Sequence, residues 1–128
     1  MDTQPKEQQE EVEMLPKKIS YDEFKKVEVR AGEILSVSKV DGSEKLLKLS
    51  VDFNEEKGPR QIVSGIAKYF EDEQVLVGKK CMFVTNLEPR ALMGLESDGM
   101  LFAVGGKEGN PFNLLEVSKE TQNGTLAS

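Results

Sequence analysis

Residues 86–100 carry side chains of the types that bind phosphate or stack on a base. The segment contains an amide at Asn86, a guanidinium directly after a proline at Arg90, and a hydroxyl just before a turn at Ser97. A guanidinium can pair a phosphate through two parallel hydrogen bonds, or it can stack on a base. Apolar runs at 81–85 and 100–104 flank the segment, so we expect a loop that joins two strands. Polar groups on such a loop are often functional, although an ordinary solvated connection explains them equally well.

The composition favours a binding domain over an enzyme. The chain has no histidine, which removes the usual general base and the commonest metal ligand. We therefore expect no catalytic residue, no metal and no cofactor. The single cysteine, Cys81, excludes an internal disulfide and lies in an apolar run, so it is predicted to be buried in a cytoplasmic protein. No apolar run is long enough to cross a membrane, and no membrane partner is expected.

Charge is distributed unevenly along the 128 residues. The net charge is −6, but residues 1–16 hold five acids and one base, so most of the excess lies there. We predict a disordered acidic linker or tail over 1–18, one folded domain over 19–118, and a C-terminal tail over 119–128. Because affinity for phosphate depends on local potential, a nearly neutral domain can still present a basic face.

Period-two alternation predicts strands in the first half of the domain. Ser20 and Glu23 have the spacing of a capping box, which predicts a helical turn just before the first strand. Residues 27–37 alternate, with Gly32 where a strand would bulge or bend, and residues 47–53 alternate most clearly. We expect these two strands to form an antiparallel hairpin.

Shorter elements are predicted in the second half. Residues 60–64 form a third strand, and apolar residues at helical spacing from Ile66 onward predict a short helix before the strand at 81–85. Strands at 100–104 and 112–117 complete the set. This order predicts an all-β fold, a five-stranded OB-type barrel with a short helix between strands three and four and small terminal additions. A mixed α+β sandwich is the alternative.

Several segments, in this order and spacing, then resemble the tRNA-binding domain appended to methionyl-tRNA synthetases. They are Tyr21-Asp22-Glu23-Phe24-Lys25-Lys26-Val27-Glu28-Val29-Arg30-Ala31-Gly32, Lys45-Leu46-Leu47-Lys48-Leu49, Ile62-Val63-Ser64-Gly65-Ile66-Ala67-Lys68-Tyr69, Val77-Gly78-Lys79-Lys80 and the whole of 86–100. The resemblance covers about residues 19–118. The same module occurs as free-standing dimeric tRNA-binding proteins and in a small export-associated chaperone.

The resemblance implies an OB fold that binds tRNA near the outer corner of the L-shaped molecule. It also implies that the domain recognises the shape and backbone of tRNA and does not read the anticodon. The acidic segment before the domain favours a C-terminal domain joined in cis to the catalytic body of a synthetase, a ligase. A free-standing dimeric tRNA-binding protein and a chaperone-like peptide binder are the alternatives. The residues that match the binding positions of the family are Arg30, Lys45, Asn86, Arg90, Ser97 and Met100.

Other roles for these residues remain open. Arg30 could form a salt bridge with Glu28 or Glu44, Asn86 and Ser97 could cap turns, and Met100 could belong to the core. Arg90 is the strongest single candidate, because it follows a proline and is not needed for packing.

Two departures from the family pattern lower the expected affinity. The first turn, usually His-Pro-x-Ala-Asp-Lys-Leu, reads Val-Asp-Gly-Ser-Glu-Lys-Leu over 40–46, and the usual Pro-Arg-Lys-Leu-Met-Gly has alanine at position 91. Both changes reduce the positive electrostatic potential, the first at the turn over 40–46 and the second at the loop over 86–100. The apolar segment with Phe112, Leu114, Leu115 and Val117 predicts a homodimer, which the resemblance also implies.

Overall fold

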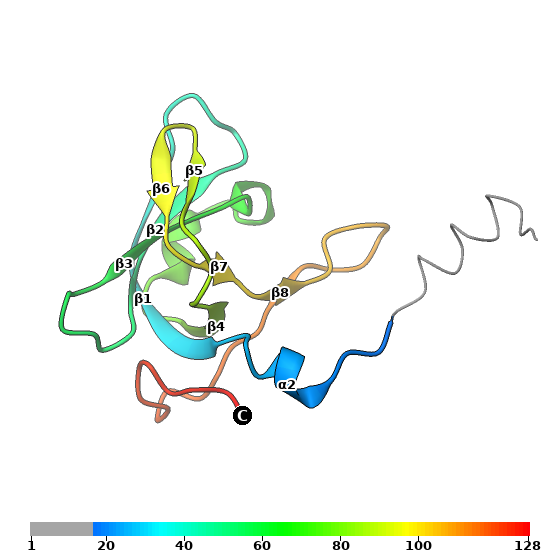
Figure 1. Cartoon of the computed structure of the whole chain (residues 1–128). Helices are drawn as coiled ribbons and strands as arrows, with labels where there is room; N and C mark the ends of the chain where they lie inside the picture. The colour runs from blue at the N-terminus through cyan, green and yellow to red at the C-terminus, as the bar shows by residue number, and fades with distance from the viewer. Residues whose placement is uncertain (1–16) are drawn as a thin grey trace, which may run out of the picture.

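A five-stranded antiparallel sheet organises residues 17–128, the part of the chain that the computed structural model describes (Figure 1). The strand order is β3-β2-β1-β4-β7. The elements are α2 (Tyr21–Phe24), β1 (Val29–Lys39), β2 (Leu47–Asp52), β3 (Arg60–Ser64), the 3-10 helices η1 (Ala67–Tyr69) and η2 (Glu73–Leu76), β4 (Lys80–Val84), β5 (Arg90–Leu92), β6 (Leu95–Ser97), β7 (Met100–Leu101), β8 (Ala103–Val104) and β9 (Asn113–Leu114).

Strand β1 is long enough to pair with two neighbouring strands along different parts of its length. Its first half pairs with β4, from Val29 opposite Val84 to Glu33 opposite Lys80, and its second half pairs with β2. Gly32 lies where the pairing changes, and a Cβ there would come within 2.5 Å of the Phe53 ring, so only glycine fits beside that ring. The expected bulge is not at Gly32. The register shift occurs between Ile34 and Ser36 instead.

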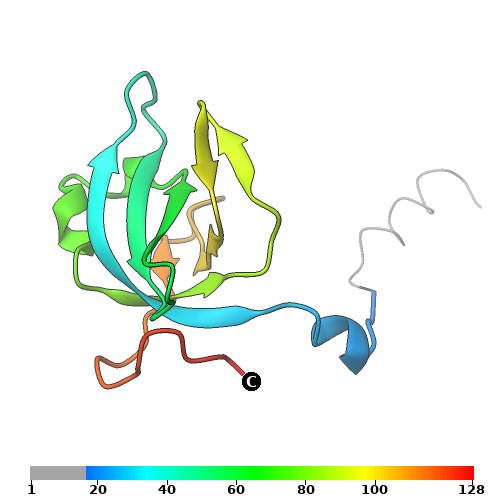
Figure 2. The ribbon, with the colours of Figure 1, turned by 60° about the vertical axis from the view of Figure 1, so that its left-hand side comes forward.

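The barrel closes where β3 meets β6 and β7. The backbone N–H of Asp98 donates to the carbonyl of Gln61 at 2.8 Å, and the Gln61 amide donates to the carbonyl of Glu96 at 2.9 Å. These bonds bring the last strand of the sheet back to the first one (Figure 2). The predicted OB-type barrel is therefore confirmed, and the α+β sandwich is not.

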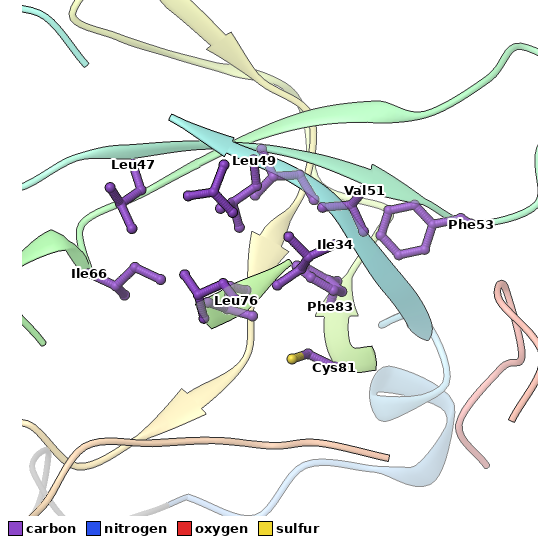
Figure 3. Packing of buried hydrophobic residues seen from close by; sticks show 12 residues of the cluster. Ile34, Leu47, Leu49, Val51, Phe53, Ile66, Leu76, Cys81 and Phe83 are labelled. Atoms are coloured by element: carbon purple, nitrogen blue, oxygen red, sulfur yellow. The ribbon is translucent and has the colours of Figure 1, made fainter. Parts of the chain in front are cut away.

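The interior of the barrel is filled by the inward phase of its strands. Leu47, Leu49 and Val51 of β2 are fully buried, as are Ile34 of β1 and Phe83 of β4. Figure 3 shows these side chains packed together in the interior, with Ile66 and Leu76 lying opposite Leu47 and Leu49. Cys81 is also fully buried here, as predicted.

Several predicted elements are confirmed with shifted bounds. Ser20 and Glu23 form the capping box of α2, with bonds of 2.9 and 3.1 Å. The short helix predicted after β3 is a pair of 3-10 helices, η1 and η2. The strand expected over 100–104 is divided into β7 and β8, and the one expected over 112–117 is reduced to β9 and an isolated bridge between Cys81 and Glu116.

The C-terminal segment that the sequence analysis treats as a tail runs along β1. Gly124 donates to the carbonyl of Ala31, Ala31 donates to that of Thr125, and Ala127 donates to that of Val29. The C-terminus consequently lies near α2 (Figures 1 and 2). Across residues 17–128, no helix combines the length and the apolar character needed to cross a membrane.

Candidate nucleic-acid interface

The segment predicted as an open loop contains a small hairpin, β5–β6. Met93 and Gly94 connect its strands with positive φ angles of 51° and 79°, the geometry of a two-residue hairpin turn. Arg90 of β5 lies opposite Ser97 of β6, so the two side chains share one face of the hairpin. That face looks onto Val63 of β3 across a small apolar cleft of about 70 Å³.

Arg90 is exposed at the edge of this cleft. Within residues 17–128, no carboxylate lies at ion-pair distance from its guanidinium. Met100, with 45% of its surface exposed, lines the same cleft. Arg90 and Met100 therefore line one cleft, and the guanidinium has no ion-pair partner among the described residues.

Ser97 lies in the same place but is only 5% exposed. Its hydroxyl accepts a hydrogen bond from the backbone N–H of Val63 at 2.9 Å and donates to the carbonyl of Gly99 at 3.2 Å. The residue thus fastens the hairpin to β3, and its polar atom is occupied inside the protein.

Asn86 anchors the start of the loop. Its Oδ1 accepts from the backbone N–H of Glu28 at 2.8 Å, and its Nδ2 donates to the carbonyl of Lys26 at 2.5 Å. The amide therefore bridges to the chain that enters β1, and it does not cap its own turn.

Arg30 lies away from this cluster, near the start of β1. Its Nε is 3.0 Å from a carboxylate oxygen of Glu28, and its Nη1 donates to the carbonyl of Gly124 at 2.7 Å. The hydrogen bond with Glu28 raises the pKa of Arg30, and the same bond, followed by that from Thr85, lowers the pKa of Glu28. The β1–β2 turn lies at the other end of β1, roughly 30 Å away for an extended strand of this length.

The turn between β1 and β2 carries Lys45 and lies beside the β5–β6 hairpin. A Cβ on Gly42 would be 3.5 Å from the terminal methyl of Met93, which places the two tips in contact. Both project from the same end of the barrel (Figures 1 and 2). Lys45 is exposed and has no ion pair within residues 17–128.

Beside the hairpin and the turn lies a polar depression of about 290 Å³ on the outer surface of β1, β2 and β3. The polar residues that line it are Ser36, Ser38, Lys48, Ser50, Arg60 and Gln61. The register places Lys48 opposite Val63 and Ser50 opposite Gln61, so β2 and β3 contribute one continuous outer face. Lys48 is not among the residues predicted to bind, although the polar phase of its alternating strand indicates that its side chain faces outward.

The charges divide into paired and available cations. Within residues 17–128, Arg30, Lys39, Lys57, Arg60 and Lys79 lie at ion-pair distance from carboxylates, whereas Arg90 and the other lysines do not. Among the unpaired cations are Lys45, Lys48 and Arg90. These three available cations border the outer face of β2 and β3. In OB folds this face and the two loops beside it are the surface that binds oligonucleotides.

A separate apolar groove of about 390 Å³ lies between α2, the start of β1 and the C-terminal segment. Its walls include Tyr21, Phe24 and Leu126, which are 73%, 57% and 53% exposed. The segment expected to be a dimer surface is more enclosed. Phe112 stacks on Tyr69 with ring centroids 4.2 Å apart and packs against the core.

Comparison with known proteins places this geometry in a family. Residues 29–126 match the family model described as "Putative tRNA binding domain". The chain is 42% identical over 120 residues to a methionine–tRNA ligase of Methanocella arvoryzae, covering 94% of this chain and 17% of that protein. It is 47% identical over 110 residues to the corresponding ligase of Caldanaerobacter subterraneus, covering 86% of this chain and 16% of that protein. The chain thus spans about a sixth of the length of these relatives.

Solved structures show the same fold. A MetRS-related protein from Pyrococcus horikoshii superimposes with a TM-score of 0.79 at 35% identity, covering 88% of this chain and all of that one. The chaperone CsaA from Bacillus anthracis superimposes with a TM-score of 0.74 at 23% identity, again over 88% of this chain and all of that one. At that identity the second match establishes the fold alone.

Proposed function

Because this chain belongs to the tRNA-binding domain family, we propose that it binds tRNA on the outer face of β2 and β3. The observation that carries the assignment of the face is the set of three available cations, Lys45, Lys48 and Arg90, around a depression lined by hydroxyl and amide groups. Arg90 and the two lysines contact phosphates. Met100 forms an apolar edge of the same surface, while Ser97 and Asn86 hold the loop that carries Arg90. Arg30 contributes a weaker contact at the far end of β1.

The chemistry of this face suits a folded RNA backbone. Serine hydroxyls and the Gln61 amide can exchange hydrogen bonds with ribose 2′-hydroxyls and phosphates. The residues that line the depression within 17–128 are polar or aliphatic, which suits contacts with the RNA backbone. We therefore propose recognition of tRNA by shape and backbone, with no reading of the anticodon.

We propose further that the domain is the C-terminal appended domain of a methionyl-tRNA synthetase and acts in the cytoplasm. The likeness to about a sixth of two methionine–tRNA ligases supports this arrangement. A tethered second site for tRNA raises its effective concentration near the catalytic body without a catalytic residue in this chain. The full-length match to the Pyrococcus horikoshii protein favours the second candidate, a free-standing tRNA-binding protein.

A homodimer forms part of this proposal. The exposed apolar side chains of Tyr21, Phe24 and Leu126 are a better self-association surface than the segment around Phe112, which packs on its own barrel. Sedimentation at micromolar concentration is expected to give about twice the chain mass of 14.2 kDa. Phe24→Asp is expected to shift the species toward one chain mass, and a single-chain mass for the unaltered protein would contradict the dimer.

The tRNA proposal is tested by titrating the domain with tRNA, a DNA hairpin and an unfolded peptide at several salt concentrations. Each phosphate contact contributes about −0.7 to −0.9 to the slope of log K against log salt, so three contacts give a slope of about −2 to −3. We expect this slope with tRNA and weaker binding of the DNA hairpin, which lacks 2′-hydroxyls. Salt-independent affinity with preference for the peptide would overturn the proposal and favour a chaperone-like role.

A further inference from the structure

Arg60 is the most enclosed cation of the described chain that pairs with a carboxylate, and neither the sequence motifs nor the family match gives it a role. Its side chain, at the start of β3, is 9% exposed. Its Nε and Nη2 donate to the two carboxylate oxygens of Glu55 at 2.9 and 2.8 Å. Its Nη1 donates to the backbone carbonyl of Thr85 at 2.7 Å and lies 3.4 Å from that of Asp98.

These contacts join three parts of the chain that are distant in sequence. Glu55 lies in the turn between β2 and β3, Thr85 directly follows β4 at the start of the loop, and Asp98 follows β6 just after the hairpin. One guanidinium therefore fixes both ends of the segment 86–97 to each other and to the barrel. Only a planar fork with five N–H donors can hold all three partners, because a lysine offers one compact ammonium.

Arg60 does not add to the available positive surface. Glu55 and Asp98 both lie at ion-pair distance, the latter at 3.8 Å, and the Phe53 ring lies under the guanidinium at 5.4 Å. Direct pairing with a phosphate would require the side chain to leave this enclosure. Its position suits a residue that acts through the loop.

We propose that Arg60 is a positioning residue for tRNA binding: it clamps the two ends of the segment 86–97 so that Arg90 faces the same surface as Lys48 and Lys45. This inference rests on the proposed function, since Arg90 matters only if that face binds tRNA. The clamp itself is a statement about the loop and can be measured without any ligand.

The first measurement is amide hydrogen exchange of residues 86–97 in the unaltered protein, Arg60→Lys and Arg60→Met. Both variants are expected to raise exchange in this segment while the amides of β1 and β2 stay protected, because lysine keeps the charge but loses the fork. Glu55→Gln keeps Arg60 and weakens one partner, so it should give the same change at smaller amplitude and remains informative if a variant of Arg60 does not fold. Unchanged exchange in the segment would overturn the proposal whether or not tRNA binds.

Lys80→Met is the matched control. The Lys80 ammonium donates to the carbonyls of Lys119 at 3.0 Å and Thr121 at 2.6 Å, so it fastens the C-terminal segment and makes no contact with the loop. This variant should raise exchange near 119–121 and leave both 86–97 and tRNA affinity unchanged. Equal loosening of 86–97 by Lys80→Met would mean that the effect is a general loss of stability.

The second measurement couples Arg60 to Arg90 through tRNA affinity. Arg60→Lys is expected to lower the affinity about fivefold or more in the unaltered chain and to have almost no effect in the presence of Arg90→Ala. Independent, additive losses would mean that Arg60 touches tRNA directly, which overturns the proposal. If the unaltered protein fails to bind tRNA, the proposed function fails while the exchange experiment still decides the clamp.

Discussion

At the scale of single residues, exposure and partners separate the side chains that can meet a ligand from those that hold the surface. Arg90 is exposed and has no carboxylate partner within residues 17–128. Arg90→Ala should remove a charge-assisted contact worth roughly 1.5–3 kcal/mol, so tRNA affinity should fall about tenfold or more. Thermal melting should be unchanged, because the side chain makes no hydrogen bond or ion pair with the described residues.

Asn86→Ala is the matched comparison at the start of the same loop. Both polar atoms of Asn86 are bonded to backbone groups of the chain entering β1. The variant should lower stability by about 1–2 kcal/mol and weaken tRNA binding as a consequence of the looser loop. Paired tRNA titration and thermal melting distinguish the two residues. A lower melting temperature for Arg90→Ala with normal binding would make Arg90 structural.

Cys81 offers a probe of the intact barrel. Burial raises the pKa of its thiol to about 11, so the reactive thiolate is almost absent at neutral pH. The native protein should therefore resist alkylation, and labelling should follow the denaturant-induced unfolding curve. Rapid labelling without denaturant would indicate that the barrel opens locally around β4.

The sequence identified the residue types of this surface better than their roles. Arg90 was recognisable as an exposed cation, because a residue after proline in a polar loop has no packing duty. The burial of Ser97 could not be foreseen, because its partner, the backbone of Val63, is 34 residues away. Arg60 has no local signal for the same reason, because loop closure gives it its neighbours, whereas Lys48 was recognisable from the polar phase of its alternating strand.

At the scale of elements, the hydroxyl of Ser97 supplies one of the hydrogen bonds that join β6 to β3. Ser97→Ala would leave the buried N–H of Val63 without its acceptor, which costs about 1–3 kcal/mol. Thermal melting should show a loss of several degrees. Ser36→Ala, on the exposed side of β1, should stay within about 0.5 kcal/mol of the unaltered protein. Equal losses of stability in the two variants would show that the Ser97 hydrogen bond contributes no more than an exposed hydroxyl.

The turn between β2 and β3 should make stability depend on pH. The hydrogen bond from Arg60 holds the pKa of Glu55 below its ordinary value of 4.5, and the bond from Arg30 does the same for Glu28. A lowered pKa in the folded state means stabilisation that is complete above the ordinary value and is lost as pH falls through the lowered one. The melting temperature should thus be level near neutral pH and fall below about pH 4.5.

Glu55→Gln should make the fall of the melting temperature at acid pH less steep, because the substituted side chain no longer titrates. Glu56→Gln is the adjacent control, since Glu56 is exposed and has no ion pair within residues 17–128. Melting curves between about pH 3 and 7 make the comparison. If the melting temperature falls equally steeply at acid pH in both variants, Glu55 does not contribute to the pH dependence of stability.

Elements with clear alternation were predictable, and those defined by distant pairing were not. The hairpin of β1 and β2 follows from the period-two pattern of residues 47–53. The β5–β6 hairpin was missed because its strands are three residues long and its turn is Met93-Gly94, not the usual Asn-Gly or Asp-Gly. The register shift near Leu35 likewise depends on how β1 meets β2, which no local sequence signal marks.

At the scale of the whole molecule, charge must be considered by region. The net charge of −6 opposes binding of a polyanion, yet five acids and one base lie within residues 1–16. The remaining chain is close to neutral and presents three available cations on one face. The cations on this face attract tRNA while the net negative charge repels it. Salt screens both effects over a Debye length of about 8 Å at physiological ionic strength.

The repulsion of tRNA by the N-terminal acids can be measured separately by changing four of them to glutamine together, namely Glu7, Glu10, Glu11 and Glu13. The four changes remove four negative charges from a net charge of −6 and leave residues 17–128 unaltered. The altered chain should associate with tRNA several-fold faster at low salt, because the loss of four negative charges lowers the electrostatic barrier to encounter. The gain should vanish near 0.5 M salt, where the Debye length is only about 4 Å. Stopped-flow association rates across this salt range measure the effect. A rate increase that persists at high salt would mean that residues 1–16 cover the binding face by direct contact, and that their charge is incidental.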